Sequence, residues 1–261
     1  MLLQGDDIMI KIFIDPGHGG DSVGASYKGR LEQDDCLRLA LAVRDILFTQ
    51  KGVEVMLSRE DDTDPDLLRR CERANGWGAD YFLSVHRNAF SPEAATGVEA
   101  WVYSGVQTGG ETYTMAENIV NGVCAVTGLR NRGVRKGAPA YRDYAVNNYT
   151  KMHSCLLEAG FIDNSEDNAV FDEKLGEIAV SIARSIMENM GLTFVPPAVK
   201  GDVDGDGRVT AEDARIILRA AVGLEDADPE RGDIDGDGAV TAADARSALR
   251  FSSGQEVQDG K

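Results

Sequence analysis

The sequence predicts an α/β domain, with a mixed, largely parallel sheet flanked by helices on both faces, followed by a small all-α module of loop–helix repeats. Two observations predict this organisation. Short apolar runs alternate with segments of helical spacing between residues 10 and 190, and the pattern GDVDGDGRVTAEDAR returns near the end of the chain as GDIDGDGAVTAADAR. Alternating strands and helices favour a sheet covered on both sides, whereas the repeat indicates a second, separate unit.

The apolar runs have the length of buried strands, and they occur at residues 10–14, 53–57, 81–85, 98–103 and 155–157. Between them, apolar side chains recur every three or four residues, which is typical of helices that cover a sheet. These helical segments are residues 32–50, 65–73, 111–126 and 166–190. Because most strands are followed by a helix, the strands are expected to run largely parallel.

A short segment containing Pro196-Pro197 separates the α/β part from the repeat, since adjacent prolines interrupt both helix and strand. The chain is long enough for one full hydrophobic core beside a small appendage. The expected organisation is a main domain at residues 9–194, a linker at 195–200, the repeat module at 201–253 and a flexible tail at 254–261.

The composition argues against some classes of partner. The formal net charge is −17 in 261 residues, whereas nucleic acid and anionic lipid require clustered Lys and Arg. No window approaches the roughly 20 apolar residues of a membrane span, and the start MLLQGDDIM lacks the basic and apolar regions of a signal peptide. No membrane span and no export signal are therefore predicted. The four cysteines form no CxxC pair and are expected to be free thiols.

The repeated segment is unusually acidic, with 13 Asp or Glu and 6 Arg in residues 201–253. Each copy has aspartates at positions 1, 3, 5 and 12 of a loop and a glycine at position 6, which is the spacing of a calcium loop, and a backbone carbonyl at position 7 completes the site. The expected ligands of two Ca²⁺ ions are Asp202, Asp204, Asp206, Arg208 and Asp213 in the first loop, and Asp233, Asp235, Asp237, Ala239 and Asp244 in the second.

Each loop is followed by a helix with an apolar stripe, whereas Pro196-Pro197 and Pro229 leave no room for a helix before it. This arrangement resembles a type I dockerin over residues 201–253. The resemblance implies calcium-dependent docking to a cohesin domain. Many dockerins carry hydroxyl-bearing residues at loop positions 10 and 11, where this chain has Ala211-Glu212 and Ala242-Ala243. A cohesin is therefore a partner expected from the resemblance alone.

The chain has only three histidines, and two of them follow predicted strands, as His18 in IFIDPGHGG and His86 in YFLSVHRNA. Functional groups of an open α/β sheet gather at the carboxyl ends of its strands, and Glu32, at the start of the first long helix, is placed to reach the same edge. Two histidines and one glutamate leave a fourth position open on zinc, as a catalytic site requires. One catalytic Zn²⁺ bound by His18, Glu32 and His86 is therefore predicted.

These segments resemble the zinc-dependent N-acetylmuramoyl-L-alanine amidases of the amidase 3 family, from about residue 10 to residue 190. The family pattern matches DPGHGG with His18, a glutamate that opens the first helix at Glu32, SVHRNA with His86 and LLEAGFIDN with Glu158. The resemblance implies that the first three residues bind zinc and that Glu158 acts as general base and acid. It also implies that the substrate is the amide between N-acetylmuramic acid and L-alanine in peptidoglycan, cleaved by a zinc-activated water.

Two further segments bear on this resemblance. RGVRKG, at residues 132–137, is expected to form the substrate-side loop of the family. His153-Ser154 stands where the family usually has Pro-Ala, so the local turn is expected to differ there. His153 does not occupy a ligand position and is expected to be a surface or supporting residue.

Two alternative functions remain open on the sequence alone: a catalytically inactive, zinc-containing cell-wall binder, and a different zinc peptidase of the wall. A zinc carboxypeptidase usually carries its first His and Glu in a short HxxE element, whereas His18 and Glu32 are much farther apart. The expected site of action is the cell wall or another extracellular site, reached by an export route that the sequence does not indicate.

Overall fold

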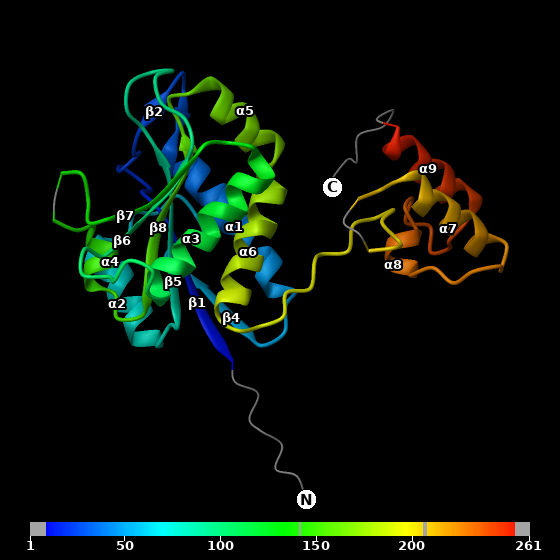
Figure 1. The fold of residues 1–261 in the computed structure, drawn as a ribbon, viewed down its shortest axis with the longest axis horizontal. Coiled ribbons are helices and arrows are strands. Elements are labelled where there is room, and N and C mark those ends of the chain that lie inside the picture. The colour runs from blue at the N-terminus through cyan, green and yellow to red at the C-terminus, as the bar shows by residue number, and fades with distance from the viewer. Residues whose placement is uncertain (1–8, 141, 206–207, 254–261) are drawn as a thin grey trace, which may run out of the picture. The chain divides into compact units, whose positions relative to one another are not determined.

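The computed structural model describes residues 9–140, 142–205 and 208–253. The chain separates into two compact units, one ending at Val195 and the other beginning at Pro196 (Figure 1). The backbone of Val195 is held by the first unit, because its N–H and C=O both bond to the Gln50 side chain, at 2.9 and 2.8 Å. The predicted tail at residues 254–261 lies outside the described residues.

The first unit is built on a six-stranded sheet. In spatial order its strands are β4 (Val53–Leu57), β1 (Ile10–Pro16), β5 (Tyr81–Asn88), β8 (His153–Phe161), β6 (Val98–Val102) and β7 (Asn131–Lys136). The first four strands run parallel, whereas β6 is antiparallel to β8 and parallel to β7. The predicted mixed, largely parallel sheet is confirmed.

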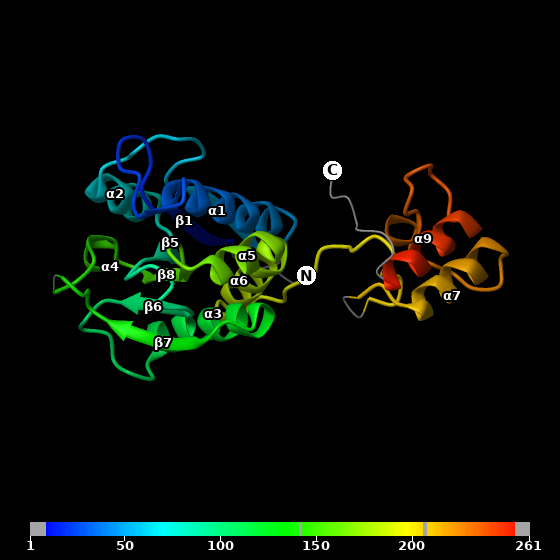
Figure 2. The same ribbon diagram turned by 90° about the horizontal axis from the view of Figure 1, so that it is seen from above.

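Helices cover both faces of this sheet (Figure 2). One face packs against α1 (Glu32–Phe48), α3 (Glu111–Thr127) and α6 (Leu175–Asn189), and the other against α2 (Leu67–Trp77) and α4 (Ala145–Tyr149). Successive strand residues point to opposite faces, so Ile12 and Ile14 enter the larger core and Phe13 enters the smaller one. The expected coverage of both faces is therefore confirmed.

The single helix expected at residues 166–190 is instead two helices, α5 (Ser165–Glu173) and α6. The break falls at Lys174, whose φ of −112° and ψ of 18° are not helical. Its Nζ donates to the carbonyl of Val126 at 2.8 Å. The prediction failed because the apolar spacing continues across the junction, with Phe171 and Ile178 both in the core.

Two other local expectations were wrong. RGVRKG, expected as a loop, contributes most of β7, and only Val134 in it is an apolar residue packed against the core. An edge strand with so few apolar positions has no clear period of two, which is why the sequence pattern missed it. The helix expected from Pro65 begins at Leu67, because the Asp66 side chain caps the backbone N–H groups of Leu68 and Arg69.

The smaller unit consists of two loop–helix repeats. Its helices are α7 (Ala211–Ala221) and α9 (Ala242–Ser252), each opened by a threonine capping box, at Thr210 and Thr241. They pack through a small core of Ala214, Ile217, Ala245 and Ala248. A one-turn helix, α8 (Pro229–Gly232), precedes the second loop, where no helix was expected; its proline occupies the first turn, which needs no N–H donor.

No helix among the described residues is long and apolar enough to cross a membrane. The four cysteines, Cys36, Cys71, Cys124 and Cys155, are all free thiols, as expected. Burial raises the pKa of Cys71 to about 11 and that of Cys155 to about 11. These thiols therefore remain protonated near neutral pH and behave as core residues.

Candidate active site

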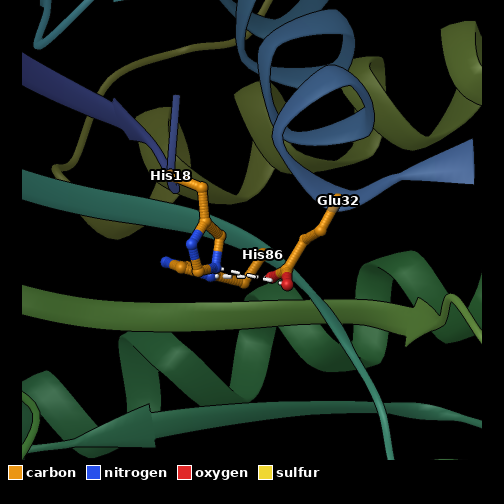
Figure 3. Close-up of side chains that lie close together, drawn as sticks. All are labelled: His18, Glu32 and His86. Atoms are coloured by element: carbon orange, nitrogen blue, oxygen red, sulfur yellow. Dashed lines mark hydrogen bonds and ion pairs between the residues drawn. The ribbon is translucent and has the colours of Figure 1, made fainter. Parts of the chain in front are cut away.

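Three polar side chains from different elements meet at the carboxyl edge of the sheet (Figure 3). His18 follows β1, His86 lies near the end of β5, and Glu32 is the first residue of α1. Glu32 Oε2 lies 3.2 Å from His18 Nε2, and Glu32 Oε1 lies 2.9 Å from His86 Nδ1. The two imidazoles meet edge to face, with ring centroids 4.9 Å apart. The structure thus brings together all three residues that the sequence predicted.

The donor atoms of this group fit a zinc ion. One nitrogen from each histidine and one carboxylate oxygen all lie within 4.8 Å of one another. Ligand atoms at about 2.05 Å from a tetrahedral zinc are about 3.3 Å apart, close to the 3.2 and 2.9 Å separations found here. Nitrogen and carboxylate ligands are those that zinc accepts, and three protein ligands leave one position for substrate or water.

Two glycines make room for these side chains. A Cβ atom at Gly17 would overlap the His86 ring, and one at Gly24 would overlap both Glu32 and His18. His18 itself has a φ of 60°, in the left-handed region that is costly for a residue with a side chain. The loop between β1 and α1 is therefore shaped to present His18, and its glycines are needed for this shape.

Two buried arginines hold this loop by its carbonyl oxygens. Arg70 donates to the carbonyls of Pro16 and His18, at 2.7 and 2.8 Å, and pairs with the Asp15 carboxylate at 2.8 Å. Arg59 donates to the carbonyls of Pro16 at 3.2 Å and of the following glycine at 2.8 Å. Both guanidinium groups are buried and hydrogen-bonded to backbone carbonyls, so the pair orients the His18 loop.

Glu32 is held as a carboxylate at the centre of the group. Its Oε2 accepts the backbone N–H of Ala25 at 2.8 Å, and its Oε1 accepts that of Arg87 at 3.2 Å. Burial acts to raise the pKa of Glu32, but the bonds with His18 and His86 outweigh it and lower the pKa well below its usual range. The residue is therefore ionised and acts as an acceptor or ligand, and not as a proton donor.

Glu158 lies directly beside this group. It is opposite His86 in the β5–β8 register and opposite Glu99 in the β6–β8 register. Its side chain is buried, and among the described residues its Oε2 has no hydrogen-bond partner. Burial raises the pKa of Glu158 well above its usual range, and the carboxylates of Glu32 and Glu99 raise it further. A buried, unsatisfied carboxyl at a cleft is a candidate for proton transfer.

A cleft of about 480 Å³ opens over these residues. Its lining includes His18, Glu32, His86 and Glu158 together with Asn88 and Tyr144. The ring of Tyr144 packs edge to face against Trp101, with centroids 5.7 Å apart. This volume lies in the range of pockets that hold a small ligand or a segment of a longer one.

Sequence reasoning assigned no role to several residues that shape the site, namely Asp15, Arg59, Arg70, Asn88, Glu99 and Tyr144, although the arginine-rich segment that holds Arg59 and Arg70 resembles the second helix of the amidase 3 family. One signal was available for Glu99, because an acidic residue inside the apolar run GVEAWV needs a buried partner. His153, in contrast, begins β8, whereas Glu158 lies near its end. It bonds to Thr112 at 2.7 Å and takes no part in the His18 group.

The repeat unit contains two further groups of acidic side chains. Carboxylate oxygens gather within 4.8 Å of one another in each loop, from Asp202, Asp204 and Asp213 in the first and from Asp233, Asp235 and Asp244 in the second. Asp237 lies in the second loop, where its carboxylate accepts the N–H of Ala239 at 2.9 Å. The expected ligand Asp206 lies outside the described residues. Arg208 and Ala239 occupy the positions where carbonyl ligands are expected.

The last aspartate of each loop also organises the local backbone. Asp213 accepts the N–H groups of Val203, Asp204 and Thr210 and the Thr210 hydroxyl, at 2.8 to 3.2 Å. Asp244 makes the corresponding four bonds in the second repeat, at 2.8 to 3.1 Å. This carboxylate therefore fixes the loop against the helix that follows it, in both copies.

Comparison with known proteins gives two family matches. Residues 12–188 match the family described as N-acetylmuramoyl-L-alanine amidase (Amidase_3), and residues 200–247 match the dockerin type I domain. Among solved structures, the N-acetylmuramoyl-L-alanine amidase of Clostridium difficile 630 has a TM-score of 0.65 at 30% identity, over 70% of this chain and 98% of that one. The catalytic domain of CwlV from Bacillus (Paenibacillus) polymyxa var. colistinus has a TM-score of 0.63 at 32% identity, over 71% and 100%.

Similar proteins of known sequence include the N-acetylmuramoyl-L-alanine amidase CwlM of Bacillus licheniformis, 40% identical over 189 residues. The match covers 71% of this chain and 69% of CwlM. The sporulation-specific N-acetylmuramoyl-L-alanine amidase of Bacillus subtilis is 39% identical over 61% of this chain and 59% of its own length. The chain thus spans between about three fifths and about two thirds of these two relatives.

Proposed function

The chain belongs to the N-acetylmuramoyl-L-alanine amidase (Amidase_3) family, and on that premise we propose that it hydrolyses the amide between N-acetylmuramic acid and L-alanine in peptidoglycan. The observation that carries the proposal is the position of Glu158, buried and unsatisfied beside the group of His18, Glu32 and His86. A structural zinc site fills all four coordination positions with protein ligands, and it does not require a buried, unsatisfied carboxyl beside it.

In this proposal His18, Glu32 and His86 hold one zinc ion. The chemistry that zinc supplies when bound is polarisation of the amide carbonyl and activation of a water at neutral pH. Glu158 takes the proton of that water at its Oε2 and passes it to the departing nitrogen of L-alanine. The raised pKa of Glu158 favours its protonated form, which is the form that donates the proton in this second step.

Arg59 and Arg70 keep the His18 loop in place during this cycle, since both bond to its carbonyl oxygens. Glu32 keeps its charge because the backbone N–H groups of Ala25 and Arg87 donate to its two oxygens. The walls around Glu158 exclude bulk water from its carboxyl, because the residue is only 7% exposed. These residues provide a fixed arrangement of charge, which is the main protein contribution to such catalysis.

We also propose that the repeat unit binds two Ca²⁺ ions and docks to a cohesin domain. The ligands are Asp202, Asp204, Asp206 and Asp213 with the carbonyl of Arg208, and Asp233, Asp235, Asp237 and Asp244 with the carbonyl of Ala239. The match to the dockerin type I family and the two aspartate groups support this proposal. The enzyme would then act on the cell wall or at another extracellular site, as part of an assembly.

Digestion of purified peptidoglycan, followed by mass spectrometry of the soluble products, tests the proposed reaction. We expect intact stem peptides with a free L-alanine amine, together with glycan strands that have lost them. An inactive wall binder would release nothing. A zinc peptidase of the wall would release fragments cut within the stem peptide, and either result would overturn the proposal.

A further inference from the structure

A group of basic side chains lies beside the active site of a protein that is otherwise acidic. Residues 130–142 carry five positive side chains and no acidic one, against a net charge of −17 for the whole chain. Part of this segment is β7, the edge strand next to β6 (Figure 1). Positive charge concentrated at one edge of an acidic protein attracts anionic groups to that edge.

Two of these residues, Arg132 and Arg135, contact Glu99, which lies next to the active site. Glu99 Oε2 accepts a hydrogen bond from Arg132 Nε at 2.7 Å and lies 3.7 Å from Arg135 Nε. Glu99 is opposite Glu158 in the strand register, and its Oε1 accepts the amide of Asn88, a cleft residue, at 2.9 Å. The Glu99 side chain therefore connects the two arginines to Asn88 in the wall of the cleft.

A β-bulge places the arginines in this way. Val98 pairs with Asn131, but Glu99 pairs with Gly133, so that Arg132 is an extra residue in the edge strand. Bulges beside active sites re-aim a side chain that regular pairing would direct elsewhere. Beyond the bulge, Arg135 is opposite Trp101, whose ring packs on the cleft residue Tyr144.

Arg135 has the properties of an anion-binding residue. Its side chain is 49% exposed, and the 3.7 Å approach to Glu99 is its one ion pair among the described residues. Within the same described ranges its guanidinium donates no hydrogen bond. The Arg132 side chain is more buried, with 24% of its surface exposed, and it donates hydrogen bonds to Glu99 and to the carbonyl of Thr96. Because Glu99 offsets only one of the two positive charges, the pair retains a net positive charge.

We propose that Arg135, oriented by Arg132 and Glu99, binds a carboxylate of the stem peptide on the leaving-amine side of the scissile bond. This inference rests on the proposed amidase function. In that substrate the carboxyl of the N-acetylmuramic acid is itself part of the amide, so every free carboxylate lies on the peptide. A guanidinium presents a planar fork of donors that matches such a group.

The geometry of the sheet sets the position of this carboxylate. Neighbouring strands are about 4.8 Å apart, and Arg135 is level with Leu156, two residues before Glu158, so Arg135 and Glu158 are about 12 Å apart along the sheet. An extended peptide advances about 3.5 Å per residue, which makes this distance equal to about three residues. The carboxylate that Arg135 recognises is therefore carried by the second or third residue of the stem.

The test compares full-length, zinc-loaded enzyme variants on soluble N-acetylmuramoyl tripeptides. One substrate carries free carboxylates on the second and third residues, and two others carry a carboxamide at one of these positions. Arg135→Gln is expected to raise KM about tenfold on the free acid with little change in kcat, which is the usual worth of one charge-assisted bond. Wild-type enzyme is expected to show the same rise on one of the two carboxamides, which identifies the position.

Lys136→Gln is the matched control. It removes the same charge from the adjacent residue, whose side chain points to the other face of the strand. Its KM is expected to stay at the wild-type value. Equal KM values for Arg135→Gln and wild type, or an equal rise in both variants, would overturn the subsite. If the wild-type enzyme cleaves none of the substrates, the proposed amidase function itself is wrong, and the two failures are thereby distinguished.

Discussion

The candidate zinc site and the two aspartate loops are built in opposite ways. His18, Glu32 and His86 come from three elements and meet only because β1 and β5 are neighbours in the sheet. The aspartates of each loop lie within twelve residues of one another and need only a local turn. The large unit therefore creates its site through the fold. The small unit carries its aspartates close together in the sequence but has only a small core to support them.

The buried carboxyls of the two units show the same contrast. Asp244 is fully buried and accepts four hydrogen bonds; burial acts to raise its pKa, but bonds from Thr241 and Asp235 outweigh it and lower the pKa. Glu158 is buried beside other carboxylates with an oxygen unsatisfied in the described part, and its pKa is raised. A satisfied carboxylate stabilises structure or binds a cation, whereas an unsatisfied carboxyl is available for chemistry.

The strongest test of this contrast is Glu158→Gln. The substitution keeps shape and polarity but cannot accept a proton, so turnover is expected to fall by roughly 10² to 10⁴. Bound zinc is expected to stay at the wild-type level, because Glu158 is not one of the three proposed ligands. His18→Ala is the comparison, since it should lose metal and activity together. A Glu158→Gln protein that lost its zinc, or that kept nearly full turnover, would contradict the role assigned here.

A second test asks how far the fold controls the zinc site. Gly17→Ala introduces a Cβ that overlaps the His86 ring, and the displaced ligand is expected to weaken zinc binding about 10- to 100-fold. Competition with a zinc-binding dye measures this affinity. Gly76→Ala, in α2, is the control, because a Cβ there meets nothing within 4 Å. Equal zinc affinities in the two variants would show that the ligand geometry is less constrained than the structure indicates.

The third test concerns the small unit. Without calcium, the closely spaced carboxylates repel one another and the helices bury little apolar surface, so an isolated segment of residues 196–261 is expected to lose most of its helix. Circular dichroism with and without Ca²⁺ measures the change, and Asp235→Asn should shift the midpoint to higher calcium. A calcium-free segment as helical as the loaded one would mean that hydrogen bonds such as those of Asp213 and Asp244 are sufficient.

The smallest effect is expected from removing the small unit altogether. A chain that ends at Pro197 keeps Val195 and its bonds to Gln50, as well as every residue of the proposed active site. Its kcat on a soluble muropeptide is expected to stay within about twofold of the full chain, because independent domains keep their own function. A large loss of turnover would show that the second unit contributes to the site.

Much of the fold and of the site could be predicted from the sequence because the relevant signals are local. Apolar runs and helical spacing give the strands and helices of an α/β sheet, and the loop pattern gives the two aspartate groups. Even the meeting of His18, Glu32 and His86 follows from a simple rule, since residues at the carboxyl ends of parallel strands share one edge. The roles of these residues stay predictions until the metal and the rates are measured.

The tertiary structure alone decided which strands are neighbours. The insertion of β8 between β5 and β6 places Glu158 between His86 and Glu99, and the bulge in β7 brings Arg132 to the same carboxylate. The contacts of Arg59 and Arg70 with the His18 loop likewise join distant segments. Strand order and bulges depend on pairing between segments far apart in the chain. The free energy of that pairing cannot be inferred from a local pattern of residues.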